Sequence, residues 1–334
     1  MAIRLDHLYR LTDETGLFQH ARGAEPDPAF GYCLDDNARA LVAAMRAHAL
    51  EGTGELLQYI ERYLVFVERS QRSDGRFRNF MAADGRWLED IGSGDAHGRA
   101  VWALGFAAEH ALSDDMRARA VRCLHAILPH IASYDSVRSS AFMLLGLDCW
   151  RRAEPGAALH EVRQQLTARL AAAYVAGSAP GWLWFEDELT YSNAHVCQAL
   201  LSGPERSIGL ASLAWLCEVL ESDGVMSLIG SDGFYPRGGR RAVYDQQAID
   251  AEATLSACLA AMEISDDSRF RRWAIMAFGW FTGQNVGHRS MIEAVSGGCY
   301  DGLTPAGVNT NQGAESLLAW LLAQEDMAEA GLLG

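Results

Sequence analysis

Six clusters of polar residues recur along the chain, and each stands directly before an apolar run rich in Ala and Leu. The first reads DDNARALVAAMRAHA and covers 35–49. Adjacent carboxylates, an amide and an arginine cost free energy when they are buried, and apolar packing does not need them. Such groups can act as general acid and base, and can hydrogen-bond hydroxyl groups. The other five clusters with their apolar runs cover 95–110, 135–150, 187–201, 245–262 and 311–323.

Helix capping explains any one of these clusters taken alone. Asp, Asn and Ser are preferred N-cap residues because they satisfy free backbone N–H groups and complement the helix dipole. A cap needs one residue, however, whereas several clusters continue into the helix. Arg39 lies three residues after Asp36 and therefore on the same helix face. Because buried charges need partners or a water-filled cavity, six converging clusters predict a polar pocket with several carboxylates and two histidines.

Four aspartates are the predicted catalytic residues: Asp36, Asp95, Asp187 and Asp245. Asp187 follows Trp184 and Phe185, an apolar setting that would raise a carboxyl pKa, and is therefore the predicted acid. Glu186, Glu252 and Glu315 are further candidate carboxylates. The predicted substrate-binding residues are Asn37, Arg39, His97, Arg99, Trp184, Glu186, Tyr191, His195, Gln246, Glu252, Asn311 and Glu315.

Aromatic residues accompany the clusters, most densely in the segment 181–191. For Trp182 and Trp184, a sugar-stacking platform and ordinary core packing are both open interpretations. Aromatic rings with amide, carboxylate and arginine groups are what a carbohydrate site uses. Asp95 and His97 have the spacing of two metal ligands but lack a third, so we expect no metal, and no cofactor motif is present.

Helices of two kinds must position these residues. The runs after the clusters are apolar nearly all round, as in helices buried on every side. One-sided amphipathic helices are expected between them, near 3–11, 54–70, 113–129, 158–176, 205–221 and 267–282. Twelve alternating helices predict an all-α fold, an (α/α)6 barrel of inner and outer helices that forms one domain over 1–334. An open solenoid would need polar capping repeats, and 311–323 is too apolar to be one.

The connections between these helices are asymmetric. Loops that leave the buried helices are short, whereas 72–94, 221–244 and 283–310 are long, Gly-rich and lead into them. Long loops inside a compact domain are usually functional. Two Asp-Gly turns flank 76–83, which predicts a β-hairpin there and small hairpins in the other long loops. All these loops are expected at the end of the barrel that holds the polar clusters.

Composition restricts the possible partners. The chain has 334 residues, 49% of them hydrophobic, and a formal net charge of −15. A strongly acidic protein without a basic patch is a poor ligand for nucleic acid or an anionic membrane. Seven scattered cysteines without a C-x-x-C pair predict reduced core thiols. With no signal-peptide core and no apolar run of the ~18 residues of a membrane span, we expect a cytoplasmic protein.

Three phrases carry a resemblance to a known superfamily: GYCLDDNARAL, YDQQAIDAEATLSACLA and NTNQGAESLLAWL. With the sixfold layout, they resemble the six-hairpin glycosidase-like superfamily of (α/α)6 toroids. They look like the helix starts of bacterial glycosidase-like proteins that accompany glycosyltransferases. The resemblance implies a toroid that acts on sugars. The superfamily contains glycoside hydrolases, polysaccharide lyases, phosphorylases and N-acylglucosamine 2-epimerase-like isomerases.

Three functions follow as hypotheses. The leading one is a glycoside hydrolase that acts on a short oligosaccharide with a carboxylate acid and base, which inverting enzymes hold roughly 6.5–9.5 Å apart. The second is a sugar isomerase or 2-epimerase, in which His195, with His97 or His288, moves the proton next to a carbonyl group. The third is a non-catalytic glycan-binding or scaffold protein.

Overall fold

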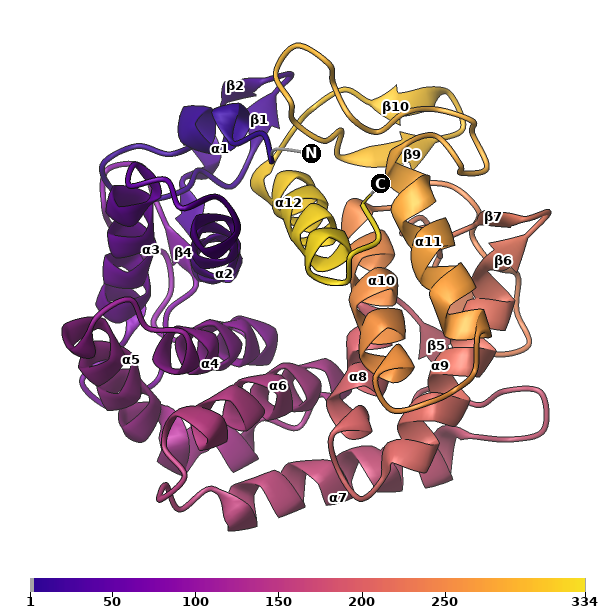
Figure 1. Cartoon of the computed structure of the whole chain (residues 1–334), viewed down its shortest axis with the longest axis horizontal. Coiled ribbons are helices and arrows are strands. Elements are labelled where there is room, and N and C mark those ends of the chain that lie inside the picture. The colour runs from indigo at the N-terminus through magenta and orange to yellow at the C-terminus, as the bar shows by residue number, and fades with distance from the viewer. Residues whose placement is uncertain (1–2, 334) are drawn as a thin grey trace.

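Twelve α-helices form two concentric rings in the computed structural model, which describes residues 3–333 (Figure 1). The inner ring consists of α2 (Leu34–Glu51), α4 (Gly94–Glu109), α6 (Val137–Ala153), α8 (Asn193–Leu201), α10 (Ala248–Met262) and α12 (Ala314–Glu329). The outer ring consists of α1 (Asp6–Leu11), α3 (Leu56–Ser70), α5 (Asp114–Ile127), α7 (His160–Gly177), α9 (Arg206–Leu220) and α11 (Arg269–Phe281). The predicted alternation of inner and outer helices is confirmed.

The inner ring is closed. Each inner helix contacts the next inner helix along the chain, and α12 contacts α2. Each inner helix also packs on an outer partner: α2 on α3, α4 on α5, α6 on α7, α8 on α9, α10 on α11 and α12 on α1. The chain is therefore an (α/α)6 barrel, as predicted, and not an open solenoid.

Residue size explains how closely the inner helices approach one another. Gly105 of α4 and Gly146 of α6 face each other where these two helices cross. A Cβ atom on Gly105 would lie 2.2 Å from the carbonyl oxygen of Gly146, and one on Gly146 would lie 2.4 Å from that of Val101. The outer helices are one-sided, and α3 buries Ile60, Leu64 and Val67 while its other face is charged.

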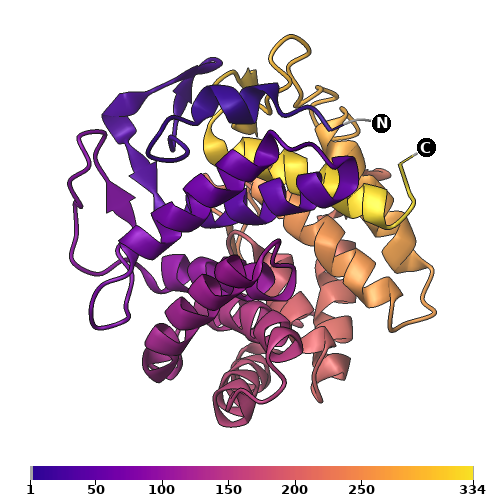
Figure 2. The same ribbon diagram turned by 60° about the vertical axis from the view of Figure 1, so that its left-hand side comes forward.

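Within residues 3–333, ten short strands form five antiparallel pairs in the loops. The pairs are β1 (Ala21–Arg22) with β2 (Glu25–Pro26), β3 (Tyr32–Cys33) with β4 (Phe80–Met81), β5 (Glu188–Leu189) with β8 (Tyr235–Pro236), β6 (Glu221–Ser222) with β7 (Val225–Met226), and β9 (Gly302–Thr304) with β10 (Gly307–Asn309). Short 3-10 helices cover Pro28–Phe30 and Leu128–Ser133. In Figure 2, the indigo and purple strands lie beyond one end of the neighbouring helices.

The hairpin predicted for 72–94 forms only in part. Both Asp-Gly turns close, since Arg72 N donates to Arg76 O at 2.7 Å and Ala82 N donates to Arg86 O at 2.9 Å. The strand between them, β4, pairs with β3, and within its own loop it forms only a single antiparallel bridge, from Met81 to Trp87. Because β3 directly precedes α2, this pairing fixes the start of the first inner helix. Among residues 3–333, no helix is both long and apolar enough to cross a membrane.

Candidate active site

A cavity of about 390 Å³ opens where α2, α10 and α12 begin, at the end of the barrel that carries the long loops. We call it the carboxylate cavity. Every inner helix in its wall presents its N-terminal turn, so the polar clusters before and within those turns face a common space. Its lining comprises Gln19, His20, Cys33, Asp35, Asp36, Arg39, Asn79, Phe80, Gln247, Ala248, Asp301, Asn309, Gly313, Glu315 and Ser316.

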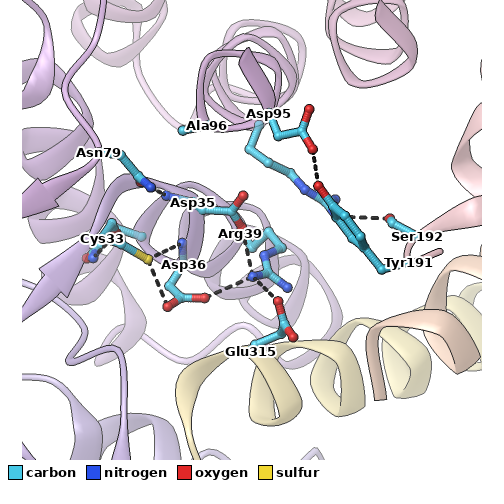
Figure 3. Close-up of polar contacts among 12 residues, drawn as sticks. Cys33, Asp35, Asp36, Arg39, Asn79, Asp95, Ala96, Tyr191, Ser192 and Glu315 are labelled. Atoms are coloured by element: carbon cyan, nitrogen blue, oxygen red, sulfur yellow. Dashed lines mark hydrogen bonds and ion pairs between the residues drawn. The ribbon is translucent and has the colours of Figure 1, made fainter. Parts of the chain in front are cut away.

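One guanidinium nitrogen holds three carboxylates together in this cavity (Figure 3). Arg39 Nη2 lies 2.7 Å from Asp35 Oδ1, 2.9 Å from Asp36 Oδ1 and 3.4 Å from Glu315 Oε2. Asp35, Asp36 and Arg39 share a face of α2 because residues three and four apart are neighbours on a helix. Glu315 comes from the first turn of α12, the helix that closes the ring beside α2.

The three carboxylates differ in their exposure to water. The Asp36 side chain is 4% exposed and that of Glu315 is 45% exposed. Burial raises the pKa of Asp36 to about 7, an effect that the positive charge of Arg39 opposes and the negative charge of Asp35 reinforces. One cation cannot neutralise three anions, so the most buried carboxyl group is the one that binds a proton.

Neighbouring side chains orient the carboxylates. The Cys33 thiol donates to Asp36 Oδ2 at 3.0 Å, and the same sulfur accepts from the backbone N–H of Asp36 at 3.4 Å as the N-cap of α2. Asn79, which lies directly before β4, accepts from the backbone N–H of Asp35 at 3.2 Å. The two carboxyl groups of α2 therefore depend on the pairing of β3 with β4.

A second polar group lies inside the barrel, away from solvent. Arg99 stacks on Phe142 at 3.8 Å from the ring centroid and donates to Ser192 Oγ at 3.2 Å. Ser192 Oγ also contacts His195 Nδ1 at 2.8 Å, and His195 Nε2 lies 3.9 Å from Glu252 Oε2. Burial, with the nearby arginines, lowers the pKa of His195 well below its ordinary value, and burial raises that of Glu252 to about 8. At pH 7, both groups are therefore neutral.

A third group of polar side chains lies at the rim of the barrel, at the starts of α4 and α6 and in the segment before α8. The Tyr191 hydroxyl donates to Asp95, whose other oxygen accepts from Ser136 Oγ at 3.0 Å. Arg138 pairs with Glu186 at 2.8 Å and donates from Nε to the Tyr191 carbonyl at 2.7 Å. Figure 3 shows Asp95 and Tyr191 together, on the opposite side of Arg39 from Cys33.

Two predicted site residues of the segment 181–191 lie elsewhere. Trp184 is fully buried and stacks on Trp215, so the platform interpretation is wrong and core packing is correct. The apolar setting expected for Asp187 is also wrong, because its side chain is 88% exposed and contacts Arg237. The physical reason is that α8 begins at Asn193: the chain first forms β5, and Ser192 takes a left-handed conformation with φ of 51°.

Four other predicted residues hold the loops in place. Asn37 bonds to the backbone of Leu17 and Cys33. His97 accepts from Phe77 N at 2.9 Å and contacts Ser93 O at 2.8 Å, so both ring nitrogens are used. Gln246 accepts from the Trp280 indole at 2.8 Å and Asn311 accepts from Gly23 N at 3.1 Å.

Asp245 lies three residues before α10 and outside the carboxylate cavity. Its φ is 60°, and its carbonyl group accepts from Ser231. It lines a separate surface cavity of about 460 Å³ with Arg240 and Arg241.

The carboxylate cavity also contains residues that the sequence does not single out. The pattern favours a cap role for Asp35 and a core thiol for Cys33. Asp301 accepts from Gly313 N at 2.7 Å and from Ser316 Oγ at 2.8 Å, which orients the start of α12. Cys33 is the N-cap of α2 and Asp36 is its third residue, and this spacing marks a helix start from which Cys33 could have been found in the sequence. Asp301 gives none, because it lies within a long loop.

Comparison with known proteins extends the description of the fold. No protein-family model and no curated protein sequence matches the chain. Among solved structures, a sugar epimerase from a ruminal bacterium is similar over 98% of both chains, with a TM-score of 0.75 and 12% identity. A cellobiose 2-epimerase from Bacillus thermoamylovorans matches over 96% of this chain and 95% of its own, with a TM-score of 0.74 and 12% identity.

A glycosidase matches over a similar length. An α-1,6-mannanase from Salegentibacter is similar over 97% of this chain and 96% of its own, with a TM-score of 0.65 and 12% identity. The chain thus shares its (α/α)6 toroid fold with these sugar epimerases and this mannanase, and the fold that the sequence resemblance implied is confirmed.

Proposed function

We propose that the protein is a carbohydrate-active enzyme, specifically a glycoside hydrolase that acts on a short oligosaccharide in the carboxylate cavity. The observation that carries this proposal is the contrast between Asp36 and Glu315 around Arg39. Asp36 is buried with a pKa raised to about 7, whereas Glu315 is partly exposed and touches the same guanidinium nitrogen. A glycoside hydrolase needs one protonated carboxyl group as general acid and one ionised carboxylate as nucleophile or base, and a difference in burial supplies both.

In the proposed reaction, Asp36 donates its proton to the glycosidic oxygen as the bond to the anomeric carbon breaks. Asp36 Oδ1 lies 2.9 Å from Arg39 Nη2, and Glu315 Oε2 lies 3.4 Å from the same nitrogen. They are therefore closer together than the roughly 6.5–9.5 Å that leaves room for water in inverting enzymes. Glu315 attacks the anomeric carbon and forms a covalent glycosyl ester. In the second step, the ionised Asp36 takes a proton from water, which attacks the anomeric carbon and breaks the bond to Glu315. This geometry favours retention over the inversion considered from the sequence.

The test is release of reducing ends from a panel of oligosaccharides, followed by NMR of the first product anomer. Asp36→Asn and Glu315→Gln should each lower turnover by about 10²- to 10⁴-fold. Asp187→Asn is the matched control, because that carboxylate is exposed and lies outside the cavity. Full turnover by both site variants would refute the assignment, and an inverted first product would refute the nucleophile.

A sugar isomerase or 2-epimerase is the second candidate, and the His195 group supports it. His195 is neutral, and its Nε2 faces Glu252 without a hydrogen-bond partner within residues 3–333. Three of the similar structures are sugar epimerases, and another is a D-mannose isomerase. Against it, His195 is fully buried between Trp102 and Phe142, which leaves substrate no contact with it. Deuterium incorporation at C2 of a free sugar, without bond cleavage and abolished by His195→Asn, would favour this candidate.

A further inference from the structure

A second cavity, of about 450 Å³, lies at the starts of α4 and α6 and beside the segment before α8. We call it the tyrosine cavity, after Tyr191. The carboxylate cavity uses the starts of α2, α10 and α12, so the two cavities divide the six inner helices between them. Both therefore open at the same end of the barrel.

We propose that the tyrosine cavity binds a second sugar unit, so that the substrate is an oligosaccharide of at least two units lying across the mouth of the barrel. This inference rests on the proposed function in one respect, that the carboxylate cavity binds a sugar.

Tyr191 is the first reason for the proposal, because its ring is exposed and yet fixed. It is 36% exposed, its hydroxyl is held by Asp95, and its carbonyl accepts from Arg138. The Arg138 guanidinium carbon lies 5.1 Å from the ring centroid. A ring immobilised at both ends can stack on the C–H face of a sugar without the entropy loss of ordering a free side chain.

The lining of the cavity is the second reason. Four serines, two tyrosines and the carboxylates of Asp95 and Asp135 line it, together with Arg138. Hydroxyl and carboxylate groups around an aromatic ring match a neutral polyhydroxylated ligand. An anion is disfavoured, since two carboxylates repel it and Arg138 is already paired with Glu186.

The electrostatic proximity of the two cavities is the third reason. Arg99 donates to Ser192, the residue after Tyr191, while its Nε and Nη1 have no hydrogen-bond partner among the described residues. Burial and the Asp95 carboxylate raise the pKa of Tyr191, and Asp35 of the carboxylate cavity adds to this effect. The charge of Asp35 in one cavity therefore acts on Tyr191 in the other, and Figure 3 shows both residues near Arg39.

Binding calorimetry with single sugars and their dimers tests the proposal. The probes are glucose against cellobiose and mannose against α-1,6-mannobiose. For at least one pair, the wild-type protein should bind the dimer at least tenfold more tightly than the monomer. Tyr191→Ala should remove this gain and leave monomer affinity unchanged, while Tyr191→Phe, which keeps the ring, should retain most of it. Tyr59→Ala, on outer helix α3, is the matched control.

Two results would overturn the proposal. One is the absence of any gain from the second unit in both pairs. The other is an equal loss of monomer and dimer affinity in Tyr191→Ala, which would mean a general structural effect. Because the readout is binding, failure of the proposed hydrolysis is a separate result: a dimer preference that depends on Tyr191, without bond cleavage, would refute the reaction and support this subsite.

Discussion

Replacement of Asp36 by asparagine should stabilise the protein at alkaline pH. The Asp36 carboxyl has a pKa of about 7 in the folded protein, against an ordinary value of 3.8. The folded state therefore holds a proton that the unfolded state has released, and the free energy of unfolding falls as the pH rises from about 4 to about 7. Three pKa units at about 1.4 kcal/mol each give a loss of about 4 kcal/mol, and the part between pH 5 and pH 7 is about 2 kcal/mol, because the folded group is still half protonated at pH 7. The amide of the variant has no such proton to lose.

Urea unfolding at pH 5, 6, 7 and 8 measures this effect as the difference between the two proteins. The difference should grow in favour of Asp36→Asn by about 2 kcal/mol from pH 5 to pH 7 and level off by about pH 8. Other buried carboxyls, such as Glu252, titrate in both proteins and cancel in the difference. Asp187→Asn, at an exposed carboxylate, should give a curve parallel to wild type. A pH-independent difference for Asp36→Asn would refute a raised pKa.

Three further predictions concern activity and packing. Hydrolysis should decrease above about pH 7, as the Asp36 proton is lost; a rate that rises steadily to pH 9 would contradict its role as acid. Cys33→Ala removes the thiol that donates to the ionised Asp36, so the alkaline limb of the pH–rate profile should move to higher pH, whereas Cys197→Ala should leave it in place. Gly146→Ala should destabilise the barrel by about 1–3 kcal/mol, measured by thermal unfolding, because the new Cβ would lie 2.4 Å from a backbone oxygen of α4. Gly156→Ala, whose Cβ would have no neighbour within 4 Å, is its control, and equal effects of the two changes would contradict this explanation.

The helices could be predicted because their pattern is local. Inner helices are apolar all round and outer helices are one-sided, and this difference depends only on which faces are buried. Ring closure followed from the apolar character of the last inner helix, α12. The β3–β4 pairing could not be predicted in the same way, because it joins segments nearly fifty residues apart and neither strand has an alternating pattern of its own.

Site residues were harder to predict because a helix start can be displaced. Asp36 and Glu315 lie in the first turns of helices that begin within three residues of the predicted starts, Arg39 follows one turn later in α2, and the structure brings the three together. The segment before α8 forms a strand and a left-handed turn, which moves Asp187 to the surface and Trp184 into the core. A shift of six residues is enough to separate a carboxylate from a pocket.

The closure of the ring has a consequence for when the candidate site is assembled. The carboxylate cavity lies on the seam between α2, the first inner helix, and α12, the last. During synthesis, the Asp36 side of the site is made early, but Glu315 cannot reach Arg39 until the final hairpin docks. The ion pair between Arg39 and Glu315 therefore forms only when the ring is complete. A circular permutant opened at the short loop 202–204 would place α12 and α2 in one continuous segment. In that protein, the ion pair between Arg39 and Glu315 would form before the ring is closed.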